Sequence, residues 1–335
     1  MIAQDASGGL SQPIVANRAG KVMDVILHLG AHRTATTGFQ DYMRRHKAPL
    51  AEQHVGFWGP GRTRRGLFSG IIPGPVAARG RDLRTRGEGR VQLRLKGARL
   101  RGVKTLVVSD ENMLGAVREN LCEGSLYPSA GERMARFARA FDGEISGLLL
   151  SVRSLELWWC SALAFGVSRG HPLPMRNKLA MIAGSQRGWR DVITDVACAV
   201  PGVPIRVMPF ESFAGRADIF LARGTGIDAP PDNDRQWLNR APGLPDLRRV
   251  LTERGTEAAE LPFGMGRWNP FSNEQHAALR EVYADDIMWL TAGADGLATL
   301  TEDRIRTRAG TTPPAGSDKK GQPDEHEERQ VARPG

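Results

Sequence analysis

The chain has 335 residues, of which 41% are hydrophobic and 25% are charged, and its formal net charge is +9. This composition is typical of a soluble globular protein, long enough to bury the core of one elaborated α/β domain or of two smaller domains. No apolar run approaches the roughly 18 residues that a membrane-spanning helix requires, so no membrane span is expected. Three widely spaced cysteines form no metal-ligand pair and indicate a reducing, cytoplasmic compartment.

The positive charge is concentrated in residues 62–104. This window holds thirteen lysines and arginines but only Asp82 and Glu88 as acids, a net charge of +11, so the rest of the chain carries −2. The window indicates either a surface that attracts an anionic substrate, such as an acidic glycan, or a solvated and partly flexible insertion rich in glycine and proline. Its few aromatic residues argue against a nucleic-acid partner.

The apolar pattern predicts strands and helices in alternation. Residues 1–20 are small and polar and predict a flexible leader without the apolar stretch of a secretory signal. Residues 307–335 are rich in glycine, proline and charge and predict a disordered tail. Buried strands are predicted at 22–29, 105–108, 147–152 and 205–208, and helices at 36–46, 132–141, 155–167, 191–200 and 273–290.

Strands that alternate with helices form βαβ units, which predict an α/β fold with three αβα layers and a central, mostly parallel sheet. We expect one domain over residues 21–306, with 62–104 as a basic insertion. Ligands of such sheets bind beyond the carboxyl ends of the strands. Three segments rich in polar side chains follow predicted strands directly, so the topology predicts that they meet at one site.

The first of these segments is a P-loop-like turn at residues 30–37, which read Gly-Ala-His-Arg-Thr-Ala-Thr-Thr. A small-residue turn between a strand and a helix exposes unpaired backbone N–H groups at the positive end of the helix dipole. Arg33 adds a full positive charge, and hydroxyl donors come from Thr34, Thr36 and Thr37. The turn therefore predicts an anion-binding loop, although a strand–helix turn with an ordinary threonine cap has a similar pattern.

This loop is not a Walker A motif, because Ala35 and Thr36 stand where that motif has its second glycine and its lysine. It resembles instead the 5′-phosphosulfate loop of bacterial-type sulfotransferases that use 3′-phosphoadenosine 5′-phosphosulfate (PAPS), written G-x-x-K-T-G-T-T. Arg33 replaces the lysine and presents a planar fork in place of a point charge. Ala35 replaces the glycine, a change that we expect to be tolerated only if the backbone there has a negative φ.

Two later segments extend the resemblance. Arg153 ends the predicted strand at 147–152, and Ser161 follows eight residues later, the separation at which sulfotransferases hold the ribose 3′-phosphate. The resemblance therefore implies that Arg153 and Ser161 bind this phosphate, although a capping arginine and a packed serine are the ordinary alternative. Residues 264–272 distantly resemble the late glycine–tryptophan segment of the family, which implies that Arg267 meets the 3′-phosphate and that Trp268 or Phe271 lies near the adenine.

The remaining segment at a strand end is the acidic cluster at residues 109–112. Transfer of a sulfuryl group to a hydroxyl needs a base within about 3 Å of the acceptor proton. Family members place a histidine or a glutamate in this neighbourhood, so Glu111 is our candidate base, with Asp110 in reserve and His32 in the loop as a rival. Helix capping by the same carboxylates is the structural alternative.

The resemblance implies a PAPS-dependent sulfotransferase that transfers a sulfuryl group in line to a hydroxyl or amine of a small-molecule or carbohydrate acceptor. The catalytic residues would be Arg33 and Glu111. The donor would be bound without a metal ion by Arg33, Thr34, Ala35, Thr36, Thr37, Arg153 and Ser161. Two alternatives stay open: a P-loop-type small-molecule kinase, which would lack its loop lysine, and a non-catalytic module that binds anions or nucleic acid.

Overall fold

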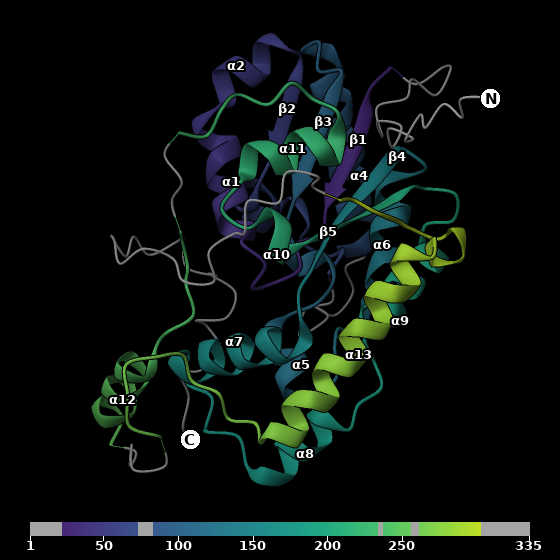
Figure 1. Ribbon diagram of the computed structural model, residues 1–335. Coiled ribbons are helices and arrows are strands. Elements are labelled where there is room, and N and C mark those ends of the chain that lie inside the picture. The colour runs from purple at the N-terminus through teal and green to yellow at the C-terminus, as the bar shows by residue number, and fades with distance from the viewer. Residues whose placement is uncertain (1–21, 73–82, 234–236, 256–260, 303–335) are drawn as a thin grey trace, which may run out of the picture.

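The computed structural model describes residues 22–72, 83–233, 237–255 and 261–302. Its centre is a six-stranded sheet in which every pair of neighbouring strands is parallel, in the order β2-β3-β1-β4-β5-β6 (Figure 1). The strands are β1 Asp24–His28, β2 Val55–Trp58, β3 Thr105–Ser109, β4 Ile145–Val152, β5 Ile205–Pro209 and β6 Thr299–Leu300. Parallel pairing places all their carboxyl ends at one edge of the sheet.

Helices cover both faces of the sheet, because side chains that alternate along a strand enter two separate cores. In β1, Val25 and Leu27 pack into one core and Ile26 into the other. The first core is covered by α4 Leu83–Leu100, α5 Val117–Glu123, α6 Ala130–Phe141, α7 Leu155–Ser168, α8 Arg176–Ala183, α9 Trp189–Ala199, α12 Leu244–Glu253 and α13 Asn273–Thr291. The second is covered by α1 Thr36–Arg45, α2 Lys47–Glu52, α10 Phe210–Phe213 and α11 Ala217–Thr225. The predicted three-layer αβα architecture is confirmed.

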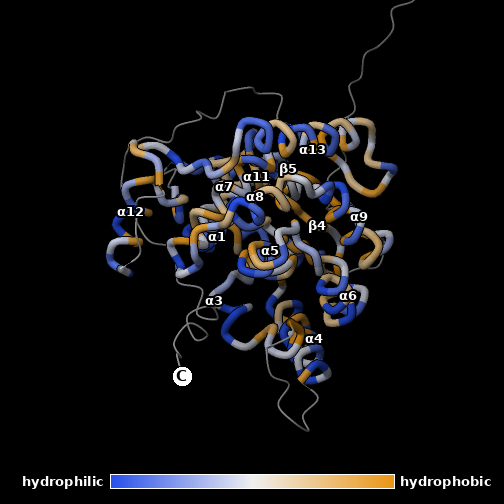
Figure 2. The backbone as a smooth tube through the Cα atoms, turned by 90° about the horizontal axis from the view of Figure 1, so that it is seen from below, coloured by the Kyte–Doolittle hydropathy of each residue, from blue (hydrophilic) through white to orange (hydrophobic). Residues whose placement is uncertain are grey.

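The shorter helices lie in the connections. They are α3 Pro60–Arg62, the π-helical turn η1 Thr63–Leu67 and the 3-10 turns η2 Glu111–Met113 and η4 Ala294–Gly296. Helix α12 stands at the side of the molecule opposite α9 in both overall views (Figures 1 and 2). None of the helices in the described ranges combines the length and the apolar character that a membrane crossing needs.

All four predicted strands and all five predicted helices are present, with ends that differ by a few residues. The sequence pattern missed β2 and β6, the two outermost strands of the sheet. The first has only four residues, including a glycine, and the second only two. Edge strands of this length lack the continuous apolar run by which a buried central strand is recognised.

The basic window 62–104 forms the connection between β2 and β3, within the part that the structure describes. Val91, Leu95 and Ala98 of α4 are buried in the first core, whereas Arg94 and Lys96 of the same helix are exposed. The segment therefore contributes to the core and presents a positive outer face. Residues 73–82 of the window, the predicted leader 1–20 and the predicted tail 307–335 lie outside the described residues.

Candidate functional site

The loop between β1 and α1 is fixed by backbone hydrogen bonds to β4. The amide of Leu29 donates to the carbonyl of Leu149 at 2.9 Å, and the amide of Ala31 donates to that of Ser151 at 3.1 Å. Gly30 lies between them with a φ of +86°, and a Cβ at this position would come within 2.8 Å of the Glu111 Cβ. A glycine is therefore required here, both by the backbone conformation and by the close approach of Glu111.

Two of the three predicted hydroxyl donors stabilise the loop itself. Thr34 and Thr36 are buried, and their hydroxyls donate to the Ala31 carbonyl at 2.7 and 2.8 Å. Thr37 is half-buried at the same loop and lines the cavity described below. The first N–H groups of α1 have no partner within the helix, because the bonds of a helix begin one turn later. The donors directed at a ligand are therefore these amides and the Thr37 hydroxyl.

The negative φ that we set as the condition for an alanine at position 35 is not found. Ala35 precedes α1 with a φ of +64° and a ψ of +18°, and Arg33 also has a positive φ of +61°. Both residues take the left-handed conformation because the loop must turn back on itself to bring Thr34 and Thr36 onto one carbonyl. The alanine therefore occupies the conformation for which the family's glycine is suited.

Substitution of Ala35 by glycine is expected to raise the free energy of unfolding by about 0.5–1 kcal/mol. The left-handed conformation costs an L-residue about 1–2 kcal/mol, part of which is offset by the greater freedom of glycine in the unfolded chain. Urea unfolding measures the change. Ala135, exposed within α6, is the matched control, because glycine at a helix interior is expected to destabilise the protein by about 1 kcal/mol. A lower stability of Ala35→Gly would contradict this account.

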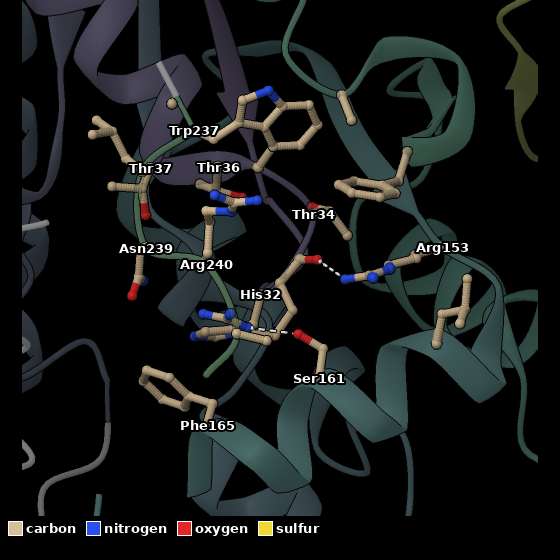
Figure 3. Close-up of a pocket in the computed structure, with 18 of the residues that line it drawn as sticks. His32, Thr34, Thr36, Thr37, Arg153, Ser161, Phe165, Trp237, Asn239 and Arg240 are labelled. Atoms are coloured by element: carbon tan, nitrogen blue, oxygen red, sulfur yellow. Dashed lines mark hydrogen bonds between the residues drawn. The ribbon is translucent and has the colours of Figure 1, made fainter. Parts of the chain in front are cut away.

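The structure brings Arg33, Arg153 and Ser161 together, as the sequence predicted. The Arg33 Nε donates to the Ser161 Oγ at 3.0 Å, and the Arg153 Nη1 donates to the Arg33 carbonyl at 2.8 Å (Figure 3). Ser161 lies on α7, and Arg153 lies at the turn between β4 and α7. The end of β4 and the helix that follows it therefore direct both side chains toward the loop.

Positive charge accumulates around this contact. Burial, assisted by the nearby charges of Arg153 and Arg169 and opposed by that of Glu111, lowers the pKa of Arg33 to about 10. Burial likewise lowers the pKa of Arg153 to about 10, assisted by Arg267. Both groups remain charged at neutral pH. Because like charges at close range repel each other, this arrangement favours an anion between them.

The loop and these arginines line a cavity of about 870 Å³. Arg267 and Trp268 from the predicted late segment line it too, whereas Phe271 is buried in the core and is absent from the lining. The opposite wall comes from a segment that the sequence reasoning missed, which contributes Trp237, Asn239 and Arg240 (Figure 3). Its tryptophan and arginine resembled ordinary loop residues in the sequence, so no pattern distinguished them.

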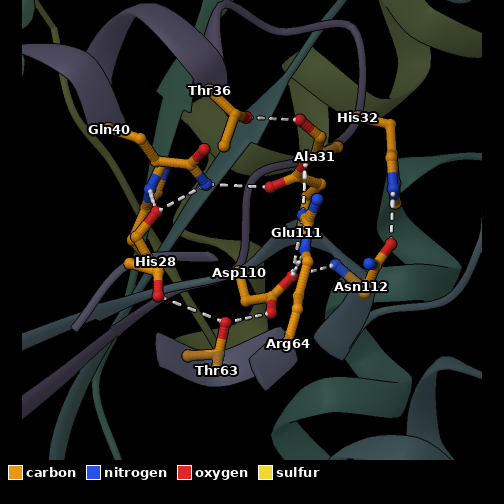
Figure 4. Close-up of polar contacts among 12 residues, drawn as sticks. His28, Ala31, His32, Thr36, Gln40, Thr63, Arg64, Asp110, Glu111 and Asn112 are labelled. Carbon is orange, nitrogen blue, oxygen red and sulfur yellow. Dashed lines mark hydrogen bonds and ion pairs between the residues drawn. The ribbon is translucent and has the colours of Figure 1, made fainter. Parts of the chain in front are cut away.

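The acidic cluster divides into a structural residue and a cavity residue. Asp110 is buried, accepts from the Thr63 Oγ1 at 2.5 Å and pairs with Arg64 at 3.0 Å. Glu111 lines the cavity, pairs with the same Arg64 at 2.9 Å and accepts from the Gln40 Nε2 at 2.9 Å (Figure 4). Arg64 and Gln40 were both missed, because the first is one of thirteen cations in its window and the second has no motif.

The electrostatics of Glu111 do not resemble those of a base adjusted to neutral pH. Burial by itself would raise the pKa of Glu111, but Arg64 and then His32 outweigh it and hold the pKa at about 2. General bases act best when their pKa lies near the working pH. Glu111 is therefore a permanently ionised carboxylate and, in this arrangement, a weak base.

Both ring nitrogens of His32 are engaged. Nδ1 lies 2.9 Å from the Tyr127 hydroxyl, and Nε2 lies 3.1 Å from the Asn112 Oδ1 (Figure 4). The backbone N–H of His32 also donates to this hydroxyl at 2.9 Å. These bonds hold the ring between Tyr127, in the connection from α5 to α6, and Asn112 of the acidic cluster, and leave neither nitrogen directed at a ligand.

The ion pair of Glu111 is expected to make stability fall in acid. A carboxylate whose folded pKa lies below its ordinary value of 4.5 stabilises the fold above pH 4.5, and this contribution is lost as the pH falls from 4.5 toward 2. The free energy of unfolding, measured in urea at pH 5.5 and pH 3, should therefore decrease less in Glu111→Gln than in the wild type. Equal decreases in the two proteins would contradict the assignment.

A scan against protein-family models and a comparison with curated proteins both returned no match for this chain. In the described ranges, no group of three or more histidine, cysteine or acidic side chains is arranged to hold a metal ion. The geometry of the loop, the arginines and the cavity is therefore what indicates the function of this chain.

Proposed function

We propose that this chain is a PAPS-dependent sulfotransferase. The observation that carries the proposal is the joint placement of Arg33, Arg153 and Ser161 in one cavity at the N-terminus of α1. Each residue comes from a segment that resembles a donor-binding motif of that family. Such motifs serve their function only when they meet, and these three are joined by direct hydrogen bonds.

The residues of the cavity fit this donor. The cavity volume of about 870 Å³ lies within the range of about 300–1,000 Å³ that is common for small-molecule sites. The loop amides, Thr37 and Arg33 would bind the 5′-phosphosulfate, and Arg153 with Ser161 would bind the 3′-phosphate. Trp237 and Trp268 offer apolar surface for the adenine.

In the proposed reaction, the S–O bond between the sulfuryl group and the 5′-phosphate breaks as a new S–O bond forms to the acceptor oxygen, and the acceptor proton passes to a base. Arg33 and the loop amides would stabilise the charge that develops on the leaving phosphate. Glu111 would receive the proton. Because its pKa is about 2, we expect this transfer to occur late, when the acceptor oxygen has become acidic.

The proposal is tested by calorimetric titration with adenosine 3′,5′-bisphosphate, the spent donor, in the absence of magnesium. Adenosine 5′-phosphate and ATP with magnesium are the matched ligands. We expect the bisphosphate to bind at least ten-fold more tightly than either of them. A preference for ATP with magnesium would favour the kinase alternative. If none of the nucleotides binds, the proposed function is contradicted.

One observation favours a second candidate, a binding module without catalysis. Glu111 is held by Arg64 and Gln40, and His32 by Tyr127 and Asn112, so no described side chain of the acidic cluster or the loop offers an unengaged base. The two candidates differ in turnover. Transfer of labelled sulfate from PAPS to a panel of hydroxyl acceptors would support the enzyme, whereas binding of the bisphosphate without transfer to any acceptor would support the module.

A further inference from the structure

One face of α7 lines the cavity along most of the helix. Leu157, Ser161 and Phe165 follow each other at four-residue intervals, which keeps them on one face, and all three line the cavity. Arg169, the next position in this row, caps the C-terminus of α7. Its guanidinium carbon lies 5.2 Å from the centre of the Phe165 ring, so the side chain packs against a ring that lines the cavity.

The ring of Phe165 is shared by two cations. The guanidinium carbon of Arg33 lies 4.9 Å from the same ring centre, and the charge of Arg169 contributes to the lowered pKa of Arg33. Within the described part of the chain, neither arginine forms an ion pair with a carboxylate. Two like charges beside one ring repel each other, and an anion bound between them would reduce this repulsion.

Three side chains that could bind anions follow one another along α7 and divide into two subsites. Arg153 precedes the helix, Ser161 lies at its middle, and Arg169 lies at its far end. The proposed donor is held by Arg153, Ser161 and the Arg33 loop. Arg169 therefore lies beyond Arg33 on the side away from Arg153, where a second molecule would approach.

We propose that Phe165 and Arg169 form an acceptor subsite for a molecule that carries an anionic group, a carboxylate, phosphate or sulfate, in addition to its reacting hydroxyl. This inference rests on the proposed function for the donor. A guanidinium can donate two parallel hydrogen bonds to two oxygens of such an oxyanion, and the apolar ring of Phe165 supports a sugar or aromatic ring next to it.

The test compares glucose 6-sulfate with glucose, a pair that differs by one sulfate. Each sugar is titrated by calorimetry into protein saturated with adenosine 3′,5′-bisphosphate. We expect glucose 6-sulfate to bind at least ten-fold more tightly than glucose, and Arg169→Gln to abolish this preference while binding the bisphosphate as the wild type does. Arg94→Gln, which removes one charge from the exposed face of α4, is the matched control and should keep the preference.

Equal binding of the two sugars, no binding of either, or a preference that survives in Arg169→Gln would overturn the inference. The failure of the proposed function has a different signature, because the bisphosphate itself would then not bind. In that case the same two sugars are titrated into the free protein and into Arg169→Gln. A sulfate preference that depends on Arg169 supports the anion subsite, and its absence refutes it.

Discussion

Replacement of Arg33 by alanine is expected to reduce sulfuryl transfer about a thousand-fold, close to the loss of detectable activity. Removal of a single donor aimed at developing charge costs a factor of about 10²–10³ in turnover, and Arg33 supplies a full charge and not a neutral donor. The substitution also removes the hydrogen bond to Ser161 and the contact with Phe165. Transfer is followed as release of labelled sulfate from PAPS to an acceptor panel.

The matched variant is Arg33→Lys, which introduces the residue that the sulfotransferase motif has at the corresponding position. Lysine keeps the positive charge but lacks the fork that reaches Ser161, so transfer should recover to within about ten-fold of the wild type. If both variants are equally inactive, the loss comes from disrupted loop geometry and not from charge. Turnover of Arg33→Ala at the wild-type rate would contradict the role of Arg33 altogether.

The central strands were predictable because strands buried on both faces must be apolar throughout. The runs that became β1, β3 and β4 carry this signal. From parallel order alone it followed that the loop at Arg33, the cluster at Glu111 and the turn at Arg153 would meet at one edge. Such inferences succeed because topology, and not side-chain detail, determines which strand ends are neighbours.

The remaining features of the site depend on packing between distant segments. Arg64 pairs with Glu111 only because η1 folds against the end of β3, and nothing in its sequence separates it from the other cations of its window. Likewise, the left-handed conformation of Ala35 follows from the bonds of Thr34 and Thr36 to Ala31, which no propensity encodes. The residue types indicated the chemistry of the site. The pKa and the orientation of each side chain, however, were determined by the residues that it contacts in the fold.

Replacement of Arg153 by alanine is expected to weaken the binding of adenosine 3′,5′-bisphosphate by about ten- to a hundred-fold, because a hydrogen bond to a charged group is worth about 1.5–3 kcal/mol. Arg153 is buried beside Phe210, at 4.4 Å from the ring centre, and the Trp189 indole donates to its carbonyl at 2.7 Å. The hydrogen bond from Trp189 involves the backbone of Arg153 and therefore remains when the side chain is removed. Calorimetry on the variant measures the loss.

Adenosine 5′-phosphate separates recognition from damage to the fold, because it lacks only the 3′-phosphate. If Arg153 binds that phosphate, the variant loses affinity for the bisphosphate while its affinity for adenosine 5′-phosphate changes little, because adenosine 5′-phosphate has no 3′-phosphate for Arg153 to hold. Equal losses for both ligands would instead mean that Arg153 supports the loop through the Arg33 carbonyl. Ser161→Ala should show the same selectivity with a smaller loss, because a neutral hydroxyl contributes only about 0.5–1.5 kcal/mol. Selectivity in both variants would thus assign the 3′-phosphate to this pair of residues, on evidence that requires no knowledge of the acceptor.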